Sequence, residues 1–240
     1  MATQRVHDLD LNSIHFHSPT FNIKGQKVVE LSFDKDSTAW SNRMTLQLCY
    51  DETKPLISNW ALGQVREGQD PTKREYELAL NKEVEDKLAA LDKLILKKAY
   101  ENSREWFKKD LKYEQVEARY KGIVKSAKME GDPNFIKIKV KCAPAEKPTP
   151  IKKLSEDGTS ISNSNISILT RNAKVVPTVR IMNVWFMSDS FGVSLAAHKL
   201  IVTPLPQKEF QEHFLLSKKL VNVTSSDNEE VDEDVPEDTM

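Results

Sequence analysis

The amino-acid sequence predicts a mainly β protein with a helical insertion, in the α+β class, followed by a disordered acidic C-terminal tail. Several segments alternate apolar and polar residues at every second position, which is the period of a half-buried strand. From residue 82 the apolar spacing changes to three and four, which is the period of a helix. Residues 221–240 are rich in acids and lack the apolar content needed to fold.

The predicted strands begin after a polar N-terminal arm. Residues 1–20 are irregular in pattern and are expected to form that arm. Residues 21–33 predict a strand, and residues 43–50 predict a second one with a clearer alternation. Residues 74–80 alternate again, so a further strand is expected directly before the helical segment.

The helical insertion is expected over residues 82 to about 128. Asn81 is a suitable N-cap, and acidic residues occupy the first turn. A second, shorter helix is expected within residues 113–125. The apolar positions of the first helix recur at steps of three and four: Val84, Leu88, Leu91, Ile95 and Ala99.

Strands resume after the insertion. Residues 135–142 alternate strictly, and residues 143–164 predict a long loop with a short strand at 151–154. Residues 178–187 and 191–203 are two β-rich runs joined by a three-residue polar turn, which predicts a hairpin.

Composition limits the class of protein. No apolar run approaches the ~20 residues that a membrane-spanning helix needs, so no membrane contact is expected. The charged N-terminus is unlike a signal peptide. Cys49 and Cys142 have no metal-ligand spacing and lie in strand-like segments, where buried free thiols are the simplest interpretation. We therefore expect an intracellular, reducing compartment.

Signatures of catalysis are missing from the sequence. It contains no phosphate-binding glycine loop, no HExxH, no CxxC and no GxSxG. His15 and His17 share a face of an extended segment, but two surface histidines explain them better than a metal site. No enzyme activity, cofactor or bound metal is therefore expected.

A row of lysines is the first candidate binding feature. Lys137, Lys139 and Lys141 project from one side of one predicted strand, at intervals of about 6.6–7 Å. Such a row can neutralise successive phosphates of an extended nucleic acid by releasing counterions. A solvated sheet face that blunts aggregation explains the same pattern equally well.

Aromatic side chains are needed to hold unstacked bases. The candidates for stacking are Trp60, Phe186 and Phe191. Trp185 lies in a strand that is apolar on both faces, which favours a core position. The basic residues placed to flank a groove are Arg171, Lys174 and Arg180.

The acidic tail hides a basic body. Eight acids and no base lie in residues 227–240: Asp227, Glu229, Glu230, Asp232, Glu233, Asp234, Glu237 and Asp238. Removing these eight from the 36 acids leaves 28, against 35 lysines and arginines. A tethered polyanion can occupy a basic groove until nucleic acid displaces it, and can then recruit other proteins. A purely solubilising tail is the alternative.

The order of these elements and one stretch of sequence resemble a known family. The stretch VVPTVRIMNVWFMSDSFGVSLAAHKLIVTP, residues 175–204, is similar to the end of the barrel in OB-fold single-stranded DNA-binding proteins of large nucleocytoplasmic DNA viruses, and the layout also resembles those of T7-like phages. The resemblance implies an OB-like Greek-key β-barrel over residues 21–220. It also implies a viral protein that coats single-stranded DNA in replication, recombination or repair, with a tail that contacts replication proteins. One departure is the end of the tail, Thr239-Met240, where the phage proteins commonly have an aromatic residue.

Two other classes fit the same charges. One is an acidic-tailed interaction module such as a histone chaperone, in which the tail itself is the binding element. The other is a structural protein of a virion or replication compartment. The sequence leaves open whether the chain is a homo-oligomer.

Overall fold

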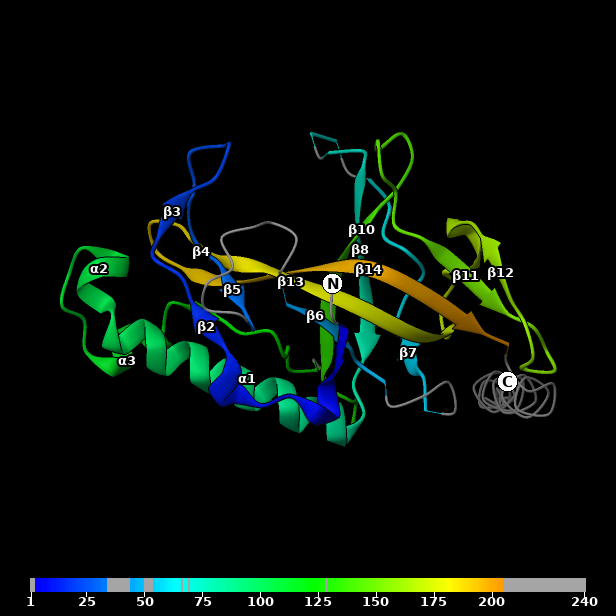
Figure 1. The fold of residues 1–240 in the computed structure, drawn as a ribbon, viewed down its shortest axis with the longest axis horizontal. Coiled ribbons are helices and arrows are strands. Elements are labelled where there is room, and N and C mark those ends of the chain that lie inside the picture. Colours follow the sequence, from blue (N-terminus) through cyan, green and yellow to red (C-terminus); the bar gives the residue numbers. More distant parts are fainter. Residues whose placement is uncertain are drawn as a thin grey trace, which may run out of the picture. The chain divides into compact units, whose positions relative to one another are not determined.

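The computed structural model describes residues 3–33, 44–49, 54–65, 67–68, 70–127 and 129–204. The described part is mostly β-sheet with few helices (Figure 1). Its strands are β1 (Thr3–Arg5), β2 (His15–Phe16), β3 (Thr20–Phe21), β4 (Lys27–Val29), β5 (Leu31–Ser32), β6 (Thr45–Gln47), β7 (Leu56–Ser58), β8 (Lys73–Ala79), β9 (Tyr120–Lys121), β10 (Phe135–Lys141), β11 (Ile151–Leu154), β12 (Ile161–Ser164), β13 (Lys174–Phe186) and β14 (Phe191–Thr203). Its helices are α1 (Lys82–Glu101), α2 (Ser103–Phe107) and α3 (Tyr113–Glu117), with 3₁₀ turns at Val6–Asp8, Leu11–Ser13 and Ile166–Ile168.

Five strands are joined by hydrogen bonds into a closed ring of pairings. β13 pairs with β7, β7 with β8, β8 with β10, β10 with β14, and β14 with β13. The β10–β14 pairing is parallel and the other four are antiparallel. Each of these strands therefore has a neighbour on both sides, which protects its backbone groups from other chains.

The longest strands form the hairpin that the sequence predicts. β13 and β14 are paired from Lys174↔Thr203 to Phe186↔Phe191. Figure 1 draws β13 in yellow and β14 in orange. β13 also pairs with β4, β6 and β7 along its other edge. It is therefore a central strand, as its apolar residues on both faces predict.

β8 and β10 follow a strict two-residue period. Tyr76 and Leu78 of β8, and Ile136, Ile138 and Val140 of β10, are fully buried in the core. The residues between them project from the opposite face, because successive side chains of a strand point in opposite directions. Lys137, Lys139 and Lys141 of β10 therefore face outward, as the sequence predicts.

The helical insertion begins where the sequence predicts. Asn81 caps α1, since its side-chain oxygen accepts a hydrogen bond from the backbone N–H of Val84 at 2.9 Å. The first helix, which the sequence predicts from residue 82 to about residue 108, is divided at Asn102 into α1 and the short α2. The second predicted helix is confined to the five residues of α3, after which the chain becomes β9.

A buried acid fastens the insertion to itself. The carboxylate of Asp92 on α1 accepts hydrogen bonds from the Tyr120 hydroxyl at 2.6 Å and from the backbone N–H groups of Ile123 and Val124 at 2.8 and 3.0 Å. Burial raises the pKa of Asp92, and these hydrogen bonds offset only part of that rise. Because β9 pairs with β14, Asp92 also links α1 to the central hairpin.

Two N-terminal expectations differ from the structure. Residues 3–16 are not an irregular arm, because β1 pairs with β6, β2 pairs with β5, and Val6 is fully buried. The single strand expected over residues 21–33 is instead the β3–β4 hairpin followed by β5. Asn22 makes the turn, since its side chain accepts hydrogen bonds from the backbone of Lys24 and Gln26, and Gly25 has a φ of 73°.

Both cysteines are buried free thiols, as expected. The acidic tail, and its predicted disorder, lie outside the described residues. No helix in the described ranges is long and apolar enough to cross a membrane.

The Asp92 contacts generate a stability prediction. Asp92→Ala should lower the free energy of unfolding by about 2–4 kcal/mol, because three donors lose their acceptor inside the protein. Urea denaturation followed by circular dichroism measures this loss. Asp86→Ala is the matched control on the same helix, since Asp86 forms an exposed ion pair with Lys82. Equal losses in the two variants would contradict the role given to Asp92.

Candidate nucleic-acid interface

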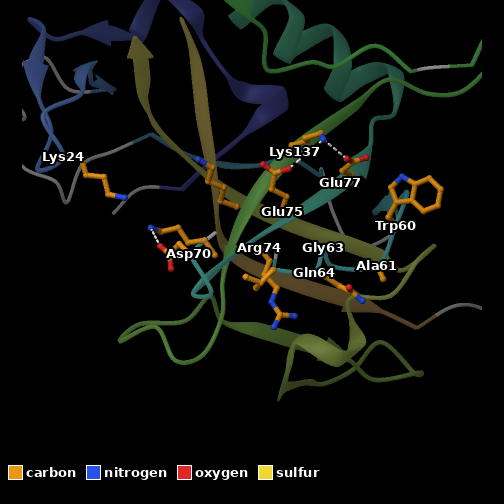
Figure 2. Close-up of a pocket in the computed structure, with 13 residues that line it drawn as sticks. Lys24, Trp60, Ala61, Gly63, Gln64, Asp70, Arg74, Glu75, Glu77 and Lys137 are labelled. Carbon is orange, nitrogen blue, oxygen red and sulfur yellow. Dashed lines mark hydrogen bonds and ion pairs between the residues drawn. The ribbon is translucent and has the colours of Figure 1, made fainter. Parts of the chain in front are cut away.

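A groove lies on the outer face of β8 and β10. It has a volume of about 830 Å³, and Figure 2 shows the side chains around it. The segment between β7 and β8 forms one wall, and the tip of the β3–β4 hairpin contributes Lys24 opposite. Its charged lining residues are five bases, Lys24, Lys73, Arg74, Lys137 and Lys139, and three acids, Asp70, Glu75 and Glu77. We call this hollow the first groove, and its lining residues carry a net positive charge.

Trp60 stands at one end of the first groove (Figure 2). Its segment is held against β8, since the Gly63 N–H donates to the Glu75 carbonyl at 2.9 Å. A side chain at Gly63 would bring a Cβ within 3.0 Å of that carbonyl, so glycine permits the close approach. The indole is 57% exposed, and the Arg171 guanidinium lies 4.8 Å from its ring centre. The predicted stacking residue is thus accessible and is held by a cation–π contact.

The lysine row is partly neutralised by the neighbouring strand. The β8–β10 register places Glu77 beside Lys137, Glu75 beside Lys139, and Lys73 beside Lys141. The Lys137 amino group lies 2.9 Å from a Glu77 carboxylate oxygen and 3.9 Å from one of Glu75. Within the described residues neither Lys139 nor Lys141 forms an ion pair. Of the three predicted lysines, Lys139 is the best placed to bind an anion, because it lines the groove and forms no ion pair within the described residues.

A second groove, of about 440 Å³, continues from the first between β10 and β14. The two share Glu75, Lys137 and Lys139 as lining residues. Trp185 and Lys125 line the second groove as well. The two grooves therefore form one path across β8, β10 and β14, with a tryptophan in each and lysines between them.

Trp185 is half-buried and lines this path, whereas the sequence favours a core position for it. Its ring packs over Gly192, where an added Cβ would lie 2.9 Å from the indole and 2.7 Å from the Lys121 carbonyl. Gly192 therefore allows the ring to lie against β14 with part of its surface in the groove.

Lys125 lines the second groove, and its backbone forms a bridge to the first residue of β10. Its backbone exchanges hydrogen bonds with Phe135, at 2.8 and 3.0 Å. Burial lowers the pKa of Lys125, Asp92 opposes this shift, and Lys137 and Lys121 add to it.

The other predicted basic residues are not among the residues that line the two grooves, although Arg171 contacts the Trp60 ring. Neither lining includes Lys141, Arg171, Lys174 or Arg180. Arg180 does share a face with Lys139, because both stand beside Ala196 in their respective pairings. Its guanidinium lies 3.2 Å from a ring nitrogen of His198, and burial, followed by Arg180 and Lys199, lowers the pKa of that histidine.

The stacking role predicted for Phe186 and Phe191 is wrong in this conformation. Phe186 is 8% exposed and Phe191 is 0% exposed. Their rings stack on one another with centres 5.9 Å apart, and Trp106 and Phe107 of the insertion cover them edge-on. The helical insertion therefore encloses both rings in the aromatic core.

Several lining residues were missed by sequence reasoning. They are Lys24, Lys73, Arg74 and Lys125, together with Trp185. The alternation of residues 74–80 places Glu75 and Glu77 on the face opposite Tyr76, but only the strand register shows that this face adjoins the lysines.

Among the described residues no group of three or more potential metal ligands occurs.

Comparison with known proteins gives a distant structural likeness. No family model and no curated protein matches the chain. A single-stranded DNA-binding protein from bacteriophage Enc34 is 8% identical with a TM-score of 0.37, over 78% of this chain and 89% of that one. The same phage protein in complex with single-stranded DNA is 9% identical with a TM-score of 0.41, over 79% and 96%. Likeness of this degree does not assign a function to this chain.

The exposure of Trp60 can be tested without a ligand. Trp60→Phe should remove more of the acrylamide-quenchable tryptophan fluorescence than Trp106→Phe, because Trp106 is only 4% exposed. Steady-state quenching of the full-length variants measures the difference. Equal quenchable fractions in the two variants would contradict the open position of Trp60.

Proposed function

We propose that this protein binds single-stranded DNA without sequence preference along the two grooves across β8, β10 and β14. The observation that carries the proposal is the arrangement of side chains: Trp60 and Trp185 line the two parts of one path, and Lys137 and Lys139 lie where the parts meet. Indole rings stack on any unpaired base, and lysines neutralise the phosphates between them.

An unpaired strand fits this path better than a duplex does. Stacking on a side chain needs a base whose face is exposed, and the bases of a duplex already stack on one another. The alternating acids Glu75 and Glu77 moderate the positive charge, so the rings contribute a larger share of binding than they would on a purely basic face. Stacking depends little on base identity, which accounts for binding without sequence preference.

The pairings of the strands support an OB-like interpretation of the ring. In chain order, β7, β8, β10, β13 and β14 pair as first with second, second with third, third with fifth, fifth with fourth, and fourth with first. OB folds bind oligonucleotides on the face of their second and third strands and on the loop between the first two. Here these parts are β8, β10 and the Trp60 segment. The likeness to an OB barrel is one of strand order, and the proposed binding depends on the side chains of the grooves.

One feature of the insertion departs from the expected layout. α1 lies between β8 and β10, the second and third strands of the ring, whereas an OB barrel places its helix between the third and fourth strands. The segment between β10 and β13 holds the β11–β12 pair instead. The insertion is therefore adjacent in sequence to the proposed binding face.

The biological role proposed is protection of exposed single strands during replication, recombination or repair, in a reducing intracellular compartment. The eight acids of residues 227–240 are proposed to compete with DNA for the basic grooves and to contact replication proteins once displaced. The charge of the grooves and the opposite charge of that segment support this proposal.

Titration with oligo-dT at several salt concentrations tests the proposal. Tryptophan fluorescence should be quenched on binding, and affinity should fall as salt rises. Lys139→Gln should weaken binding and reduce the slope of log affinity against log salt by about 0.7, the value of one phosphate contact on a single strand.

Two variants control that titration. Lys97→Gln removes an exposed charge from α1, far along the sequence from the grooves, and should leave the slope unchanged. Glu77→Gln should strengthen binding, because it removes the shorter of the two ion pairs that Lys137 forms. Salt-independent binding, or equal effects of Lys139→Gln and Lys97→Gln, would refute the proposed interface.

Deleting residues 227–240 tests the role of the acids. The truncated chain should bind oligo-dT more tightly, with the largest gain at low salt, where charge competition is least screened. Fluorescence titration of both chains measures the change. Unchanged affinity would leave the segment as a solubilising one.

A further inference from the structure

A third hollow lies where the helical insertion meets the tip of the β13–β14 hairpin. We call it the insertion cleft. It has a volume of about 500 Å³ and is bordered by β3, β4, the end of α2 and the hairpin tip. Its charged lining residues are Lys27, Lys108, Lys109 and Arg119 against Glu105 alone. The insertion cleft is thus more uniformly basic than the first groove, which has three acids.

The basic residues of the insertion cleft are held in place by the fold. The Lys27 amino group donates hydrogen bonds to the backbone carbonyls of Glu105 at 2.7 Å and Trp106 at 2.9 Å. These bonds fasten the end of α2 to β4, so the following Lys108 and Lys109 project at a fixed place. Burial, and after it the charge of Lys108, lowers the pKa of Lys27, and the charge of Glu105 opposes this shift.

The insertion cleft also exposes apolar side chains. Phe21 of β3 is 74% exposed and Met187 at the hairpin tip is 64% exposed. An aromatic ring so open to solvent beside several cations has the composition of a base-stacking site. Phe21 therefore offers an exposed ring face on which a base could stack, whereas the ring of Phe186 is buried.

Shared residues join the insertion cleft to the proposed DNA path. Met187 lines both the second groove and the insertion cleft. The β3–β4 hairpin borders all three hollows, with Lys24 in the first groove, Gln26 in the second, and Phe21 and Lys27 in the insertion cleft. An unpaired nucleic-acid strand that leaves the second groove at Met187 would enter the insertion cleft directly.

We propose that the insertion cleft is a second subsite for the same single strand, with Lys108, Lys109 and Arg119 on its phosphates and Phe21 against a base. This inference rests on the proposed function. It gives the helical insertion a role in binding, and it predicts that a long oligonucleotide gains contacts that a short one cannot reach. Charge complementarity and continuity with the grooves favour a nucleic acid over an acidic protein as the occupant.

Oligonucleotides of two lengths separate this subsite from the grooves. Full-length protein is titrated with oligo-dT of about five and about 20 nucleotides, lengths that fall within and beyond the usual range for one OB fold. The test variant combines Lys108→Asn with Lys109→Gln. Asparagine is chosen because the Lys108 backbone has a φ of 60°, which asparagine tolerates.

The double variant should bind the long oligonucleotide roughly tenfold more weakly and lower its salt slope by about 1.4, the value of two phosphate contacts. Its affinity for the short oligonucleotide should not change. Phe21→Ala should likewise weaken only the long oligonucleotide. The matched control is Lys93→Gln with Lys97→Gln, which removes two exposed charges from α1 of the same insertion and should affect neither length.

The outcomes distinguish this inference from the proposed function. If the wild-type chain binds neither length, the proposed function fails. If it binds both lengths and the double variant behaves as wild type, or loses affinity for both equally, the second subsite is wrong and the grooves stand. If an acidic peptide of residues 227–240 binds the wild type but not the double variant, while long DNA binds both, the insertion cleft takes an acidic protein segment instead, and the inference is overturned.

Discussion

Burial of one face of β10 fixes the chemistry of the other. Ile136, Ile138 and Val140 lie in the core with no exposed surface, so the alternate residues Lys137, Lys139 and Lys141 must face outward. A shift of the strand by one residue would bury three charges, at a cost of several kcal/mol for each ion. The hydrophobic core therefore holds the cations in a row and sets their spacing.

The neighbouring strands determine what that row can do. β8 places Glu75 and Glu77 beside two of the lysines, which limits the net charge of the first groove. β14 contributes Gly192, whose missing side chain leaves room for the Trp185 ring on the same surface. The interface is consequently a mixture of moderate charge and flat apolar rings, the combination that suits an unpaired strand.

The sequence predicts best where one period dominates. The β13–β14 hairpin, the start of α1 and the outward lysines follow from local alternation or capping, and the structure agrees with all of them. The aromatic residues could not be placed in this way. β13 is apolar on both faces, and its pattern does not tell which ring the insertion will cover. Trp106 and Phe107 enclose Phe186, while Trp185 on the other face remains in a groove.

Photochemical cross-linking of a single-stranded oligonucleotide, followed by mass spectrometry of the peptides, tests the proposed interface most directly. The account predicts adducts on Trp60 and Trp185, whose rings line the path, and none on the enclosed rings of Trp106 and Phe191. Adducts confined to the exposed face of α1, or to the enclosed aromatic rings, would contradict it.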